Sequence, residues 1–112
     1  MDVRITEPHT RRRVTSREIT VRGTAITPDP IQVYVRANDS RWYLQREVTF
    51  DGLDWSVDCI LGDYKVKNEH MKFQKYAIVA LLTPDRPETP LESLPSDVVR
   101  SNKVVAHLQI RG

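Results

Sequence analysis

The side chains that could act as nucleophiles or metal ligands are few and scattered along this chain of 112 residues. The sequence contains one cysteine, Cys59, and three histidines, His9, His70 and His107. A nucleophilic cysteine needs a base held against it by a hydrogen bond, but Cys59 alternates with Trp55 and Val57 on the expected inner face of a strand. No two histidines have the close spacing of a metal site, and the four glycines form no phosphate-binding loop. We therefore expect an inert buried thiol, no cofactor and no enzyme activity.

The most concentrated charge is the run Arg11-Arg12-Arg13, which Arg17 extends. Such a run could grip a nucleic acid, an acidic membrane surface or an acidic partner. It could also be a solvated loop that keeps an edge strand from pairing with other molecules. The formal net charge is only +2, whereas nucleic-acid binders usually carry a strong basic excess. We therefore favour the solvated loop and expect no nucleic-acid partner.

Size and composition indicate one small domain with its own core, since 39% of the residues are hydrophobic and 29% are charged. A single cysteine excludes an intramolecular disulfide, so packing alone must hold the fold. No apolar run reaches the length of about 18 residues that a membrane span needs. The first residues, MDVRITEPHTRRR, lack the apolar stretch of a secretory signal. We expect a cytoplasmic protein, unless the chain is one module of a longer protein.

Short β-branched and aromatic segments separated by turn residues indicate a chain of strands without a long helix. We expect seven strands, at Val3–Thr6, Arg17–Ile26, Ile31–Ala37, Arg41–Phe50, Asp54–Leu61, Lys75–Leu82 and Lys103–Ile110. Alternation within them predicts one buried and one solvated face. The sixth strand is apolar on both faces, so either it is central and covered on both sides or a partner covers its outer face.

Aromatic side chains fall on the expected outer face of two neighbouring strands. Alternation places Tyr34 and Tyr43 on the outer face and Trp42 on the inner face, with a change of register near Arg46. A shift of one residue would turn Trp42 outward as well. Aromatic residues on a sheet face can stack sugars or fill a protein interface, although they more often form stabilising cross-strand pairs.

The connection from Thr83 to Asn102 contains four of the seven prolines, at positions 84, 87, 90 and 95. A connection of about twenty residues is unusual in a compact domain and is often functional or disordered. We expect partner-binding residues between Pro84 and Pro95, with Pro84, Arg86 and Pro87 among them, and next at Tyr34, Tyr43 and the Arg11–Arg13 run.

About seven short antiparallel strands favour an all-β immunoglobulin-like or fibronectin-like sandwich, with a small closed barrel as the alternative. The segments ITVRGTA, PIQVYV, WYLQ, DGLDWSVDCILG and YAIVALL resemble those of bacterial immunoglobulin-like domains over residues 17–111. The resemblance implies glycines at turns, tryptophans in the core and no catalytic residue. It also implies a tyrosine at the start of the sixth strand, here Tyr76, whose hydroxyl bonds back to the backbone. Such domains are commonly appended to other modules.

Antiparallel strands would gather alternate loops at the two ends of the sandwich. Loops 7–16, 38–40 and 62–74 would form a basic end, and Asp51, Asp54 and the carboxylates of the proline-rich connection would form an acidic end. The carboxylates follow no known calcium spacing, so we expect no metal. Our interpretation is a non-catalytic module that binds another protein or another domain. The alternative is a carbohydrate- or surface-binding module that uses the aromatic face.

Overall fold

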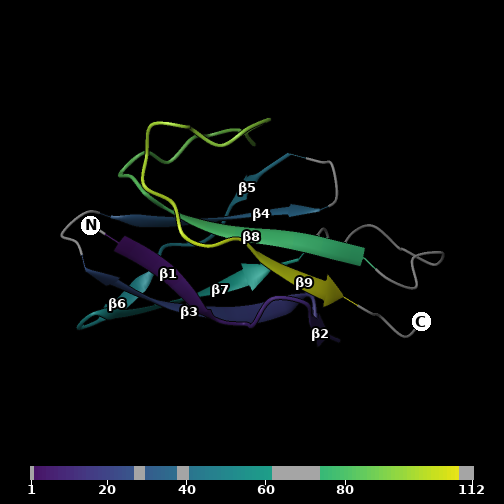
Figure 1. The fold of residues 1–112 in the computed structure, drawn as a ribbon. Coiled ribbons are helices and arrows are strands. Elements are labelled where there is room, and N and C mark those ends of the chain that lie inside the picture. Colours follow the sequence, from purple (N-terminus) through teal and green to yellow (C-terminus); the bar gives the residue numbers. More distant parts are fainter. Residues whose placement is uncertain (1, 27–29, 38–40, 62–73, 109–112) are drawn as a thin grey trace.

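The computed structural model describes residues 2–26, 30–37, 41–61 and 74–108 and shows two β-sheets packed face to face (Figure 1). The strands are β1 Asp2–Glu7, β2 Arg12–Val14, β3 Glu18–Ile26, β4 Ile31–Ala37, β5 Tyr43–Leu44, β6 Thr49–Asp51, β7 Asp54–Ile60, β8 Gln74–Leu82 and β9 Val104–Leu108. No helix occurs among these described residues. The predicted all-β sandwich is therefore confirmed.

The strands form a four-stranded sheet in the order β1-β3-β7-β6 and a five-stranded sheet in the order β2-β9-β8-β4-β5. The pairs are antiparallel except for β2 and β9, which run parallel. The chain leaves the first sheet after β1, passes the cis Glu7-Pro8 bond and joins the second sheet as β2. The expectation of a plain loop over residues 7–16 was therefore wrong, because this segment contains a strand.

The single strand expected over residues 41–50 divides into two strands that belong to different sheets. β5 pairs with β4, whereas β6 pairs with β7. Gln45 holds the crossing between them: its backbone N–H donates to the Val33 carbonyl over 2.9 Å, and its side-chain oxygen accepts from the Ile60 N–H over 2.9 Å. The predicted change of register near Arg46 is this crossing.

The core between the sheets follows the predicted alternation on most strands. Val21 and Ala25 of β3, Trp55 and Cys59 of β7, and Ile78 of β8 are among its buried residues. Gly23 lies between β1 and Trp55, where a Cβ atom would overlap the Arg4 carbonyl oxygen and the Trp55 ring. Glycine is therefore required at this position for the close approach of strand and indole.

A second apolar cluster lies on the outer face of the five-stranded sheet. It consists of the buried Tyr34, Trp42, Val79 and Leu81, with Leu44, Ala77, Leu91, Leu94 and Val98 packed against them. The proline-rich segment covers this face and is drawn in green to yellow above β4 and β8 in Figure 1. The chain itself thus covers the outer face of β8. This is one of the two possibilities that the apolar pattern on both faces of the strand allowed.

The free edge of β1 is closed by a side chain. The Asn102 amide oxygen accepts from the Ile5 N–H over 2.9 Å, and its amide nitrogen donates to the Ile5 carbonyl over 3.2 Å. The amide takes the place of a neighbouring strand at Ile5, which blocks strand addition at this point.

Candidate interaction surface

Tyr34 does not lie on an exposed face, which corrects the sequence-based expectation. It is 2% exposed beneath the proline-rich segment, and burial raises the pKa of its hydroxyl, an effect that nearby Arg86 reduces and Asp85 reinforces. The Arg86 guanidinium donates to the Gln32 side-chain oxygen over 2.5 Å and to the Gln45 carbonyl over 3.2 Å. Arg86 therefore fastens the segment to the sheet above Tyr34.

Trp42 is also covered, and it faces the outer cluster rather than the core between the sheets. Its backbone exchanges two hydrogen bonds with Leu91, of 2.7 and 3.0 Å. The Arg36 guanidinium lies 4.9 Å from the centroid of the indole ring, within the range of a cation–π contact. Tyr43, at the edge strand β5, is 52% exposed. Of the three aromatic residues considered for an exposed face, only Tyr43 is accessible.

The proline-rich segment is anchored at both ends. The Thr83 N–H donates to the Pro30 carbonyl, and the Ser101 N–H donates to the Ala80 carbonyl, each over 2.9 Å. Pro84 is exposed and Pro87 is half-buried. The segment is thus part of the packed fold, and a partner at Pro84, Arg86 and Pro87 stays a prediction.

The arginine run lies on and beside β2. Arg11 has a φ of 67° and its N–H donates to the Val105 carbonyl over 2.6 Å, whereas Arg12 and Arg13 pair with β9. All three arginines are exposed. Among the described residues the ion pairs are Arg22–Glu7, Arg41–Glu92 and Arg46–Glu18, so none involves the run.

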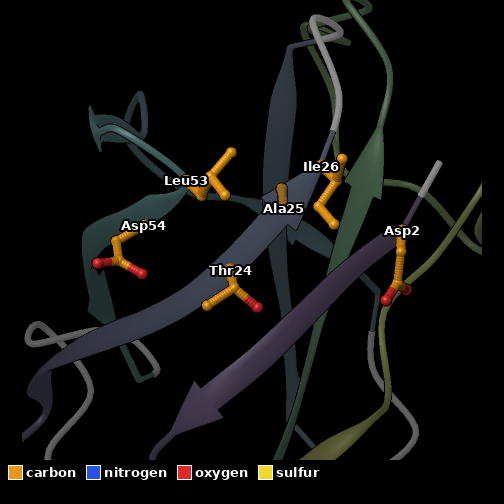
Figure 2. Close-up of a pocket in the computed structure, with 6 residues that line it drawn as sticks. All are labelled: Asp2, Thr24, Ala25, Ile26, Leu53 and Asp54. Carbon is orange, nitrogen blue, oxygen red and sulfur yellow. The ribbon is translucent and has the colours of Figure 1, made fainter.

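A hollow of about 270 Å³ lies where the start of β1, the end of β3 and the β6–β7 hairpin meet (Figure 2). Its lining consists of Asp2, Thr24, Ala25, Ile26, Leu53 and Asp54. The Ala25 N–H donates to the Leu53 carbonyl over 2.9 Å and holds the hairpin against β3. Ile26 is 70% and Leu53 is 64% exposed. Two large apolar side chains therefore meet water at one site.

Negative charge surrounds these apolar side chains. Asp51 and Asp54 are direct partners across the β6–β7 ladder, on either side of a turn that contains Gly52 at a φ of 63°. Like charges directly opposite one another destabilise a ladder. None of Asp2, Asp51 and Asp54 is in an ion pair with another described residue. The hollow thus combines exposed apolar surface with uncompensated carboxylates.

Sequence reasoning had not singled out Ile26 and Leu53 as candidates. The signals were present: alternation in β3 turns Ile26 outward when Ala25 is inward, and Leu53 is an apolar residue in a tight turn. Asp51 and Asp54, which were predicted for an acidic end, do lie beside this hollow. The structure places β6 and β2 at opposite ends of the molecule (Figure 1). The other parts of the predicted basic end, residues 38–40 and 62–73, lie outside the described residues.

The remaining titratable candidates are buried in the core. Burial raises the pKa of the Cys59 thiol to about 12, and neighbouring Asp58 adds to the effect. Burial likewise raises the pKa of Tyr76, whose hydroxyl interacts with the Arg17 side chain. Arg17 in turn donates to the Leu61 carbonyl over 3.0 Å. The implied tyrosine near the start of β8 is therefore buried, and one partner of its hydroxyl is a guanidinium.

No three histidine, cysteine, aspartate or glutamate side chains within the described ranges are grouped so as to hold a metal ion. The same ranges contain no helix of the length and apolar character needed to cross a membrane. Comparison of the chain with known protein families and with curated proteins found no family and no protein that matches it.

Proposed function

We propose that this protein is a non-catalytic binding module with an immunoglobulin-like fold, and that it docks on another protein or domain through the hollow at the β6–β7 end. The strand order supports the classification. The order β1-β3-β7-β6 corresponds to A-B-E-D of the immunoglobulin sandwich, and β9-β8-β4 corresponds to G-F-C. Two loop-bearing ends are the usual binding regions of such sandwiches.

The observation that carries the docking proposal is the pair of exposed apolar side chains, Ile26 and Leu53, at one hollow. A single exposed apolar residue is ordinary on a protein surface. Here the two line the same hollow, and Leu53 occupies a hairpin tip where turns usually place polar or flexible residues. A partner that covers them would remove their apolar surface from water. This burial favours binding by about 25 cal/mol for each Å² of apolar surface.

The carbohydrate-binding alternative depended on an aromatic face. Tyr34 and Trp42 are buried under the proline-rich segment, which leaves Tyr43 without the neighbouring rings of that face. No contact in the described residues favours this alternative over protein binding.

Site-specific photo-crosslinking in cells that make the protein tests the proposal. A photoreactive phenylalanine analogue at position 53 should crosslink to a defined protein species, and the same analogue at Ser56, on the outer face of β7, should not. Ile26→Lys should abolish the crosslink at position 53. Equal crosslinking at both positions, or no defined product at position 53, would refute docking through the hollow.

A further inference from the structure

We propose that the occupant of this hollow is a second copy of the same chain, which binds through its Arg11–Arg13 run. This inference rests on the proposed function, because it names the partner of the same surface. It goes further in predicting a head-to-tail assembly whose two contact surfaces lie on opposite ends of one domain.

Charge complementarity within the chain is the first argument. Asp2 and Asp54 line the hollow, Asp51 is the cross-strand partner of Asp54, and the three arginines are exposed on and beside β2. Neither group has an ion-pair partner among the described residues of its own copy. Complementary charges steer association and select the correct partner. The chain thus carries both halves of a charged contact.

The chemistry of arginine fits the hollow better than a simple point charge would. Its aliphatic stem can lie along apolar surface while the guanidinium stays at the rim, and Ile26 and Leu53 provide such a surface. Its planar group can bind a carboxylate through two parallel hydrogen bonds. A guanidinium near Asp51 and Asp54 would also offset the repulsion between these cross-strand partners.

The position of the two groups dictates the kind of assembly. β2 and the β6–β7 hairpin lie at opposite ends of a molecule that is 43 Å long (Figure 1). The Debye length in about 0.1 M salt is about 10 Å, so the two ends do not neutralise each other across one copy. A contact between different surfaces of two copies is heterologous and leaves one free surface at each end. Growth beyond a dimer is therefore expected.

Two variants, each of which lacks one of the two contact surfaces, test this geometry. Arg12→Ser with Arg13→Ser neutralises the basic end, and Leu53→Ser with Asp54→Ser removes the apolar and acidic side chains of the hollow, so that neither variant gains a charge that could pair with the other. In sedimentation velocity at about 20 mM salt, the unmodified protein should form species larger than a dimer as concentration rises, and each variant alone should stay monomeric. Equal amounts of the two variants should form a dimer and nothing larger, because each contributes the single end that the other lacks.

Matched controls change the same kinds of charge at residues outside the arginine run and the hollow. Lys103→Ser and Glu47→Ser alter exposed residues and should associate as the unmodified protein does. About 300 mM salt should dissolve the assembly, since the contact is largely ionic. Circular dichroism of each variant establishes that it is folded before sedimentation.

Three outcomes would overturn the inference: an unmodified protein that stays monomeric, a single-end variant that still assembles alone, or a mixture of the two variants that stays monomeric. These outcomes can be separated from failure of the proposed function. A monomeric protein whose position 53 crosslinks to a different protein keeps the docking function and loses only the self-association.

Discussion

The packing around Gly23 shows how one residue sets the distance between a strand and the core tryptophan. Gly23 pairs with Ile5 on one side and with Trp55 on the other. The indole ring occupies the volume that a side chain at position 23 would take. The indole nitrogen of Trp55 is buried and has no hydrogen-bond partner among the described residues, so packing rather than polar contact holds the ring.

Gly23→Ala should therefore destabilise the fold, because either β1 or the Trp55 ring must move. Overpacking of this kind typically costs about 1–3 kcal/mol, and the lower stability should appear as an earlier midpoint of urea unfolding. Gly52→Ala is the comparison, since its Cβ would meet open space and only the left-handed φ of 63° opposes it. The expected loss there is roughly 1–2 kcal/mol, without a change in Trp55 fluorescence. An unchanged Trp55 environment in Gly23→Ala would contradict the packing argument.

At the scale of elements, the segment from Thr83 to Asn102 acts as a third layer without regular secondary structure. It contributes Leu91, Leu94 and Val98 to the outer cluster and makes bridges to Trp42 and Leu81. Proline at this density prevents a helix or a long strand, yet the segment buries the outer face of β4 and β8. Its order therefore depends on tertiary packing.

Leu91→Ala should loosen this layer selectively. The substitution removes apolar contact with the cluster around Trp42, so local opening of the segment should become less costly than global unfolding. Hydrogen exchange should accelerate at the amides of Leu91 and Trp42, which bond to each other, while the β3–β7 ladder keeps its protection. Opening should also lower the pKa of Tyr34 towards its ordinary value, because burial is what raises it.

Leu53→Ala is the matched control, since Leu53 is largely exposed and should leave exchange unchanged. Uniform acceleration across both sheets in Leu91→Ala would indicate that the segment and the sandwich unfold as one unit.

The same elements show what the sequence could and could not predict. Alternation predicted the inner faces of β3 and β7, and the two-sided apolar pattern of residues 75–82 predicted cover on both sides of β8. The sequence did not predict that the proline-rich segment covers the outer face of β8, because this segment has the pattern of an irregular loop. Alternation also cannot distinguish a strand that stays in one sheet from the crossing at residues 45–48. Asp54 and its cross-strand partner Asp51 were predicted for an acidic end, but Asp2 and Leu53 of the hollow were not singled out.

For the whole molecule, the outer faces of the two sheets differ in kind. The face formed by β4 and β8 is covered by the proline-rich segment, whereas the outward residues of β3, such as Thr20, Arg22 and Thr24, remain exposed. Exposed polar faces of antiparallel sheets need no partner. A binding surface is therefore better sought at the ends of the sandwich than on its faces.

The ionisable groups buried on both sides of the five-stranded sheet make the stability of the whole fold sensitive to alkaline pH. The pKa of Cys59 is raised from 9.0 to about 12, and the pKa values of Tyr34 and Tyr76 are raised from 10.0. A raised pKa in the folded state means that the unfolded chain loses its proton first. The stabilisation is therefore complete below about pH 9 and is lost as pH rises towards 12.

The free energy of unfolding should fall from about pH 9 upward, with each fully ionising buried group contributing a slope of up to about 1.4 kcal/mol per pH unit. Urea unfolding at intervals between pH 7 and pH 11 measures this dependence. Cys59→Ala should make the fall shallower from about pH 9 to the end of the series, and leave the part that the tyrosines cause. If the free energy of unfolding had the same pH dependence in both proteins, the folded state would not raise the pKa of Cys59, and its burial would be contradicted.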